Sequence, residues 1–231
     1  MSTDLIKRYQ SVQKRIEAAC IQSQRDPQSV NLLAVSKTKP LEAVTELAKN
    51  GQRAFGENYV QEALTKIAIH PELEWHFIGP IQSNKTKPIA ENFSWVHSVD
   101  RLKIAQRLSA QRPENLPALN ILLEVNISHE ANKAGFLETE VIEQAVEIAQ
   151  LPNLTLRGLM AIPISESEHE KQRQPFAKMQ RLLARLQTKL PACPLDTLSM
   201  GMSGDLEAAI EEGATIVRIG TDIFGARNST K

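Results

Sequence analysis

The sequence has 231 residues, of which 42% are hydrophobic and 23% are charged, as in an ordinary globular protein. Lysine plus arginine and aspartate plus glutamate both number 27, so no overall basic field exists to attract nucleic acid or an anionic membrane. The composition therefore excludes disordered and fibrous classes, and it predicts neither a nucleic-acid nor a membrane partner.

Two further features narrow the class of protein. Cys20 and Cys193 form no Cys-x-x-Cys pair, which argues against a disulfide framework and a zinc site and favours a reducing cytoplasm. No apolar run approaches the roughly 20 residues of a membrane span, and the N-terminus lacks the apolar stretch of a secretory signal. The five histidines show no metal-ligand spacing, and no glycine-rich dinucleotide or phosphate-loop motif occurs, so we expect no metal site.

The first predicted element is an amphipathic helix near the N-terminus. Its apolar residues recur at helical spacing, at Leu5, Tyr9, Val12, Ile16 and Ala19. A transit peptide is the alternative, but it would carry fewer acidic residues than this segment does. We interpret the helix as structural, an addition to the repeated part of the fold that covers the bottom of the predicted barrel.

Short apolar runs alternate with longer amphipathic patterns along the rest of the chain, which is typical of βα units with a parallel sheet. The runs predicted as strands are 31–36, 53–56, 75–79, 95–99, 119–126, 156–161, 197–201 and 216–220. Helices are expected to begin near Leu41, Asn58, Ile81, Arg101, Glu138, Glu168 and Ser203. Eight strands without a Pro/Ser-rich linker favour one α/β domain over residues 1–231, a closed TIM (β/α)8 barrel and not an open doubly wound sheet. Segment 165–174 is predicted to be a polar, mobile loop.

Lys37 stands where the first predicted strand ends, between a buried apolar run and a helix start marked by Pro40. In a TIM barrel the carboxyl ends of the strands face the active site. A lysine there is partly desolvated and can lose its proton, as an imine-forming amine must. The alternative is a solvated lysine at the edge of a loop.

The loops after the seventh and eighth predicted strands are those from which TIM barrels commonly build a phosphate site. The first loop carries two glycines and Ser203 directly before a helix, and the second places Gly220 and Thr221 at the strand end. The alternative is that Ser203 only caps its helix and that Gly220 only permits a turn.

Arg218 lies within an apolar run, where a buried guanidinium needs acceptors for its hydrogen bonds. Two partners are compatible with the sequence: Glu124 on another predicted strand, or a ring nitrogen of a bound cofactor. Because arginine stays protonated, it would keep a neighbouring pyridine nitrogen unprotonated and weaken the ring as an electron sink.

Asn58 and His76 are further candidates, each with an ordinary structural alternative. Asn58 follows the second predicted strand, where its side chain either hydrogen-bonds a cofactor ring substituent or caps its own helix. His76 lies on an otherwise apolar strand, and we favour a satisfied core histidine over a catalytic base.

Together these segments resemble the pyridoxal phosphate homeostasis proteins, a family related to the barrel domain of alanine racemase. The resemblance spans nearly the whole chain. The motifs that carry it are AVSK at 34–37, FGENY at 55–59, WHFIGPIQSNK at 75–85, GLMA at 158–161, LSMGMS at 198–203 and VRIGT at 217–221.

The resemblance implies fold type III of the pyridoxal 5′-phosphate (PLP) proteins, with PLP held as a Schiff base on Lys37. It implies phosphate contacts from Ser203, Gly220 and Thr221, and Arg218 facing the pyridine nitrogen. The full set of implied cofactor-binding residues is Lys37, Asn58, Met200, Ser203, Arg218, Gly220 and Thr221. It further implies a monomeric cytoplasmic protein of PLP homeostasis that affects amino- and keto-acid pools, has PLP-dependent apoenzymes as recipients, and has no established reaction of its own.

Two alternatives stay open. A small PLP-dependent amino-acid racemase would need an acid/base opposite Lys37. The racemases that this chain resembles take a tyrosine from a second, largely β domain, whereas this chain ends soon after its last predicted strand and offers only Tyr9 and Tyr59. In the other alternative the barrel binds a different phosphorylated metabolite without covalent attachment, and Lys37 is incidental.

Overall fold

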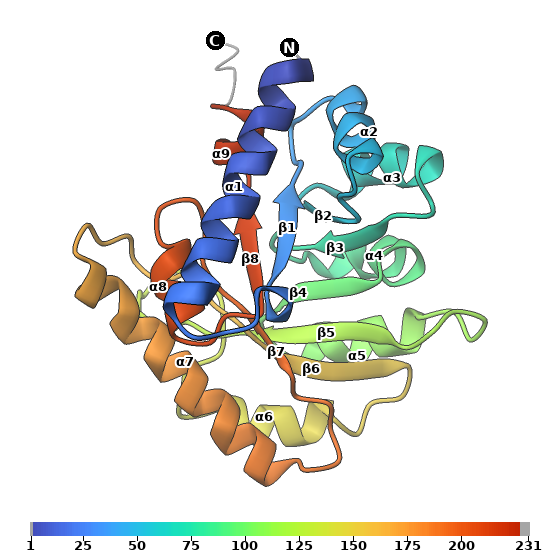
Figure 1. Cartoon of the computed structure of the whole chain (residues 1–231). Coiled ribbons are helices and arrows are strands. Elements are labelled where there is room, and N and C mark those ends of the chain that lie inside the picture. Colours follow the sequence, from blue (N-terminus) through green and yellow to red (C-terminus); the bar gives the residue numbers. More distant parts are fainter. Residues whose placement is uncertain (1, 227–231) are drawn as a thin grey trace.

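Eight parallel strands close into a barrel in which each strand pairs with its neighbours in sequence and β8 pairs with β1. The computed structural model describes residues 2–226 (Figure 1). The strands are β1 (Asn31–Val35), β2 (Ala54–Glu57), β3 (Glu74–Phe77), β4 (Trp95–Val99), β5 (Leu119–Glu124), β6 (Leu154–Met160), β7 (Thr197–Ser199) and β8 (Ile216–Ile219). The predicted (β/α)8 barrel is therefore confirmed.

Helices cover the outside of the barrel between successive strands (Figure 1). They are α2 (Leu41–Lys49), α3 (Val60–Ile69), α4 (Thr86–Asn92), α5 (Leu102–Gln111), α6 (Val141–Ile148), α7 (His169–Lys189) and α8 (Leu206–Glu211). Short 3₁₀ turns lie at Pro27–Ser29 and Ser83–Lys85. In α2, Val44, Leu47 and Ala48 are buried, which is the i, i+3, i+4 spacing of a helix that packs one face on a sheet.

The N-terminal helix α1 (Ser2–Gln22) does not cover the bottom of the barrel. It contacts α2, α8 and α9 (Thr221–Phe224), and it runs along the outside of β1 and β8 (Figure 1). Because α9 has only four residues, the outer surface beside β8 lacks a full helix, and α1 occupies that place. All five residues of its predicted apolar stripe are buried, namely Leu5, Tyr9, Val12, Ile16 and Ala19. The helix was correctly predicted, and its position was not.

Some predicted boundaries are wrong by a few residues because the loops at the strand ends have their own geometry. β7 ends before Gly201, whose φ of 96° lies outside the strand region. α8 begins at Leu206, since a hydrogen bond from the Met202 N–H to Asp205 Oδ1, at 2.7 Å, closes a turn before it. The other displaced helix starts lie at Val60, Thr86, Leu102 and Val141.

The segment 165–174 is helical in its second half, so the predicted mobile loop is too long. α7 begins at His169, and its first turns carry ion pairs three residues apart, Glu168 with Lys171 and Glu170 with Arg173. Such pairs modestly stabilise a helix end. No helix within residues 2–226 is both long and apolar enough to cross a membrane.

The inside of the barrel holds polar as well as apolar side chains. His97 of β4 lies 2.8 Å from the hydroxyl of Ser199 on β7, and since these strands are not neighbours, both side chains point across the interior. Trp95, Leu122 and Met160 form a small buried apolar cluster of their own, separate from the main core between strands and helices. The barrel is thus filled by side chains and is not a pore.

Gly158 allows β6 and β7 to approach each other. Its φ is 151°, and a Cβ atom at this position would lie 1.9 Å from the carbonyl oxygen of Thr197. No L side chain fits without moving one of the two strands. The close approach of β6 and β7 therefore explains why the GLMA motif begins with a glycine.

We predict that Gly158→Ala lowers the free energy of unfolding by about 3 kcal/mol or more, because backbone strain and a backbone clash add. Gly204→Ala is the matched control, since nothing lies within 4 Å of a Cβ atom there. Urea unfolding of both variants measures the difference. Equal stabilities would contradict the close approach of β6 and β7.

Candidate functional site

The structure brings the predicted site residues to one end of the barrel. Lys37 follows β1, Asn58 follows β2, Ser203 follows β7, and Gly220 and Thr221 follow β8. In the closed barrel the order β7-β8-β1-β2 is continuous, and all four strands are parallel. Their carboxyl ends therefore form one continuous half of the rim, the end at which TIM barrels place their active sites.

A buried polar cluster holds the end of β1 just before Lys37. Lys66 of α3 donates hydrogen bonds to the backbone oxygen of Ser36 and to Glu57 Oε1, both at 2.8 Å, and the Ser36 hydroxyl donates to the same carboxyl oxygen at 2.6 Å. Burial raises the pKa of Glu57, and the hydrogen bond from Lys66 opposes that rise. The ion pair between Lys66 and Glu57 is almost completely removed from water, so each charge depends on the other.

The residue after Lys37 is held by Glu62 of α3, which is itself a partner of Lys66. Thr38 has a φ of 59°, which is uncommon for a residue other than glycine, and its N–H donates to Glu62 Oε1 at 2.7 Å. That oxygen also accepts a hydrogen bond from Lys66 at 2.7 Å. Lys66 therefore fixes the backbone on both sides of Lys37, whose side chain is half-buried.

Asn58 does not cap α3, because Tyr59 occupies the N-cap position. Its side-chain Oδ1 is buried and accepts no hydrogen bond from the residues that the structure describes. A Cβ atom at Gly79 would lie 2.5 Å from the Asn58 carbonyl oxygen, so the two loops approach closely. The N-cap alternative is wrong, and a buried acceptor is left that a bound ligand would satisfy.

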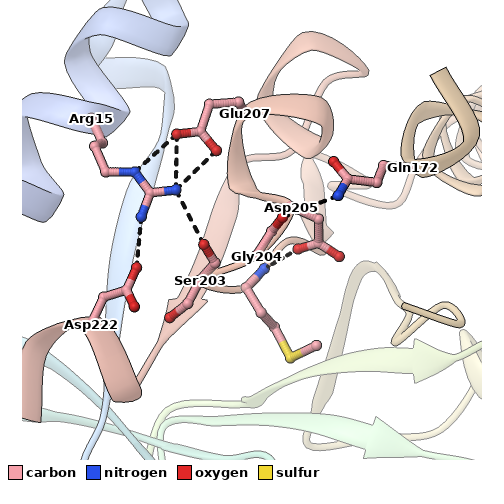
Figure 2. Close-up of polar contacts among 8 residues, drawn as sticks. Arg15, Gln172, Ser203, Gly204, Asp205, Glu207 and Asp222 are labelled. Atoms are coloured by element: carbon pink, nitrogen blue, oxygen red, sulfur yellow. Dashed lines mark hydrogen bonds and ion pairs between the residues drawn. The ribbon is translucent and has the colours of Figure 1, made fainter. Parts of the chain in front are cut away.

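Arg15 of α1 joins the two predicted phosphate loops (Figure 2). Its guanidinium donates to both carboxyl oxygens of Glu207, at 2.9 and 3.0 Å, and to the backbone oxygen of Ser203 at 3.1 Å. It also donates to Asp222 Oδ2 at 2.6 Å, in the short helix α9 that follows β8. One side chain of the N-terminal helix thus sets the distance between the loop that carries Ser203 and the loop that carries Thr221.

The loop between β7 and α8 has two further supports (Figure 2). Asp205 Oδ1 accepts a hydrogen bond from the Met202 N–H, and Gln172 of α7 donates to the backbone oxygen of Gly204 at 3.1 Å. The N-cap residue of α8 is Asp205, so Ser203 does not cap this helix. The Ser203 hydroxyl lies in the hydrogen-bonded turn that precedes α8.

Gly220 lies beside the end of β1. A Cβ atom at Gly220 would contact the Val35 carbonyl oxygen at an ordinary 3.4 Å, and its φ of −114° is open to any residue. Neither a turn nor protein packing therefore requires glycine here, whereas close approach of a ligand would. Thr221 is exposed at the start of α9, and Met200 is fully buried below the first loop.

Arg218 is 4% exposed inside the barrel and is hydrogen-bonded to groups other than Glu124. It donates to the Ser199 hydroxyl at 2.7 Å and to the Ala161 backbone oxygen at 3.0 Å. Desolvation lowers the pKa of Arg218 to about 10, so it stays protonated at neutral pH. Glu124 acts on it only through space, and burial raises the pKa of Glu124 to about 7. The two hydrogen bonds use two of the five N–H groups of a guanidinium.

His76 is a satisfied core histidine, as favoured from the sequence. It is 2% exposed, its Nε2 lies 2.7 Å from Glu74 Oε1, and its Nδ1 lies 2.8 Å from His97 Nε2. Burial lowers the pKa of His76, so the ring is neutral at pH 7. Its position below the rim separates it from the loops that carry Lys37 and Ser203.

A cavity of 840 Å³ lies at the opposite end of the barrel, where the strands begin. Its lining includes Tyr9, Asn31, Glu74 and Trp95, and none of the seven predicted cofactor-binding residues. Arg157 stands over the Trp95 ring, 4.8 Å from its centroid. Within residues 2–226, no group of three or more His, Cys, Asp or Glu side chains is arranged to hold a metal ion.

Sequence reasoning missed Arg15 and the cluster of Lys66, Glu57 and Ser36. A signal existed for Lys66, which stands four residues after Glu62 in a predicted helix, a common ion-pair spacing. Glu57, directly after a buried run, was a second signal for an inward charge that needs a partner. Arg15 gave no signal, because its partners lie about 190 residues away in sequence.

The comparisons with known proteins agree with this architecture. The family described as "Alanine racemase, N-terminal domain" matches residues 13–228. A pyridoxal phosphate homeostasis protein of Pseudomonas aeruginosa is 58% identical over 230 residues, which cover 99% of this chain and 97% of the relative. Its counterpart in Escherichia coli is 51% identical over 233 residues and 99% of both chains. This chain therefore belongs to the alanine racemase N-terminal domain family and, within it, to the pyridoxal phosphate homeostasis proteins.

Solved structures extend the comparison. PipY of Synechococcus elongatus, solved with PLP bound, is 37% identical with a TM-score of 0.81, over 96% of this chain and 100% of PipY. A protein from Bifidobacterium adolescentis is 31% identical with a TM-score of 0.89, over 96% of this chain and 95% of its own. An alanine racemase of Clostridium difficile shares the fold at 13% identity with a TM-score of 0.72, and the match covers 57% of that racemase.

We predict that Lys66→Ala lowers the free energy of unfolding by about 3–5 kcal/mol, because it leaves Glu57 buried without its partner. The combined change Glu57→Gln with Lys66→Met removes both charges at similar volume and should recover most of that loss. Chemical unfolding of Glu57→Gln, Lys66→Met and the variant that combines them gives the coupling energy. Additive effects would contradict the buried pair.

Proposed function

We propose that this protein binds PLP at the carboxyl ends of β7, β8, β1 and β2, holds it as a Schiff base on Lys37, and acts in intracellular PLP homeostasis. The observation that carries the proposal is the convergence of Lys37 and the two predicted phosphate loops on one rim of the barrel, above the buried Arg218. The similarity to PipY, whose solved structure has PLP bound, supports the choice of ligand.

The residues at this rim fit PLP in three respects. Neither the backbone conformation nor protein packing requires a glycine at position 220. A glycine there would let a phosphate lie directly against the backbone. Asn58 Oδ1 is a buried acceptor without a partner among residues 2–226. Arg218 has donors beyond its two hydrogen bonds and is positioned in the barrel below the rim.

Each residue then has a role that follows from its place. Ser203, Gly220 and Thr221 would contact the phosphate, Arg218 would face the ring nitrogen, and Asn58 would lie near a ring substituent. Met200 supports the first loop from below. When bound, PLP supplies an aldehyde that reacts with amines and a ring that can draw electrons from the adduct.

The alternative function, a small amino-acid racemase, would need an acid/base opposite Lys37. Tyr9 lines the cavity at the other end of the barrel, and Tyr59 is 56% exposed. Glu124, with its pKa of about 7, is better suited to proton transfer. A protonated Arg218 at the ring nitrogen would nevertheless weaken the electron sink that proton abstraction requires.

We therefore propose holding and release of PLP in preference to turnover. The protein acts in the cytoplasm as a monomer and a single unit over residues 1–231, passes PLP to PLP-dependent apoenzymes, and influences amino- and keto-acid balance through them. No nucleic acid or membrane takes part in this proposal, in keeping with the balanced charge of the chain.

We predict that Lys37→Ala abolishes covalent trapping of PLP by borohydride while the fold persists, since Lys37 lies in a turn and not in the core. Lys39→Ala is the matched control, a second lysine of the same turn region. Intact-mass and peptide mass spectrometry after reduction locate the adduct. An adduct that persists in Lys37→Ala, or maps to Lys39 or Lys85, would contradict the assignment.

We also predict that pyridoxal without its phosphate binds at least about 100-fold more weakly than PLP, because several charge-assisted hydrogen bonds of about 1.5–3 kcal/mol each are lost. The combined change Ser203→Ala with Thr221→Ala should remove part of that difference. Equilibrium binding of the two compounds to both proteins measures it. Equal affinities of the wild-type protein for PLP and pyridoxal would exclude a phosphate site at these loops.

A further inference from the structure

A continuous chain of hydrogen bonds crosses the barrel interior from its amino-terminal end to Arg218. Glu74 Oε1 lies 2.7 Å from His76 Nε2, and His76 Nδ1 lies 2.8 Å from His97 Nε2. His97 Nδ1 lies 2.8 Å from the Ser199 hydroxyl oxygen, which accepts a hydrogen bond from Arg218 at 2.7 Å. The chain joins β3, β4, β7 and β8 and begins at the edge of the 840 Å³ cavity.

The two ends of this chain determine the direction of every link. A guanidinium only donates, so Ser199 accepts from Arg218 and its own hydroxyl hydrogen is available to His97 Nδ1. A neutral imidazole carries one proton, so His97 has it on Nε2 and donates to His76 Nδ1. His76 in turn carries its proton on Nε2 and donates to Glu74, which only accepts while ionised. Every donor therefore points from Arg218 toward Glu74.

Burial and charge keep the chain in this protonation state. His76 and His97 are 2% and 0% exposed, and burial lowers the pKa of both rings, helped at His97 by the nearby His76 and Arg218. Glu74 is half-exposed, and the hydrogen bond with His76 lowers its pKa, so it is ionised at neutral pH. A positive group at one end and a negative group at the other polarise the neutral links in the same sense.

Glu74 is the group that selects the Nε2–H form of both histidines and so fixes the direction of the hydrogen bonds. Without an acceptor at Glu74, both rings could carry the proton on Nδ1, and His97 would then donate to Ser199. Ser199 would accept from His97 and from Arg218 together, and its own hydrogen would be buried without an acceptor, which is costly. The stacking of His76 on Trp95, with centroids 5.4 Å apart and planes within 3°, holds the ring in the orientation that Glu74 requires.

We propose that Glu74 is a positioning residue for the cofactor site, which acts through His76, His97 and Ser199 to fix the guanidinium of Arg218. Its final step, the contact of Arg218 with PLP, rests on the proposed function, while the direction of the chain rests on the geometry of this protein alone. A carboxylate at one end of the barrel thereby takes part in cofactor binding at the other.

The first test measures the tautomers in protein without PLP. Long-range ¹H–¹⁵N correlation spectra distinguish Nδ1–H, Nε2–H and imidazolium forms of each histidine. We expect Nε2–H for both His76 and His97 at pH 7, and loss of this single form in Glu74→Ala. Glu72→Ala is the matched control, since Glu72 lies 3.0 Å from His70 in a carboxylate–histidine pair outside the chain. An Nδ1–H or imidazolium form of either ring in the wild-type protein would overturn the proposal.

The second test uses the PLP-bound protein. We expect Glu74→Ala to shift the visible absorption band and to weaken PLP binding by about 10-fold, the effect of losing one well-made hydrogen bond at Arg218. Glu74→Gln keeps an acceptor oxygen and should restore both the band and the affinity, whereas Glu72→Ala should change neither. Glu74→Ala indistinguishable from wild type in band and affinity would overturn the positioning role.

The two failures can be told apart. A wild-type protein that does not bind PLP would refute the proposed function and the role of Glu74 toward the cofactor, but the tautomer spectra would still decide the direction of the chain. Normal PLP binding with unchanged spectra in Glu74→Ala would refute the positioning role alone.

Discussion

Closure of the parallel sheet, through the pairing of β8 with β1, determines where every candidate residue of this protein lies. The register that places Leu33 opposite Arg218 and Ala34 opposite Ile219 brings the ends of the first and last strands together. Lys37 and Gly220, far apart in the sequence, thereby become neighbours on one rim. In an open sheet with β1 and β8 at separate edges, the lysine and the loops could not serve one ligand.

Burial of Arg218 is the second constraint, and it explains why the barrel interior is polar along one path. A guanidinium removed from water needs acceptors, and the interior supplies Ser199 and the Ala161 carbonyl. Ser199 in turn needs an acceptor for its own hydrogen, which His97 provides. His97 and His76 each need an acceptor in the same way, and the chain of hydrogen bonds ends at the half-exposed Glu74. Polar core residues that look unrelated in the sequence are thus consequences of one buried charge.

The sequence predicted the features that follow from local pattern. Strand and helix alternation predicted the barrel, and the position of Lys37 after an apolar run predicted its place on the rim. Prediction from the sequence failed for features that depend on contacts between segments far apart in the chain. The place of α1 depends on how short α9 is, and the role of Arg15 depends on Glu207 and Asp222 meeting beside it. Of the two partners that the sequence allowed for Arg218, Glu124 makes no hydrogen bond to it, because two groups on separate strands can share a core without touching.

A crystal structure of the protein with PLP, at a resolution that separates the ring from its phosphate, tests the central claim most directly. The account predicts continuous density from Lys37 Nζ to the cofactor, the phosphate between the Ser203 and Thr221 loops, and the ring nitrogen beside Arg218. PLP found instead in the 840 Å³ cavity at the amino-terminal end of the barrel, or attached to another lysine, would contradict it.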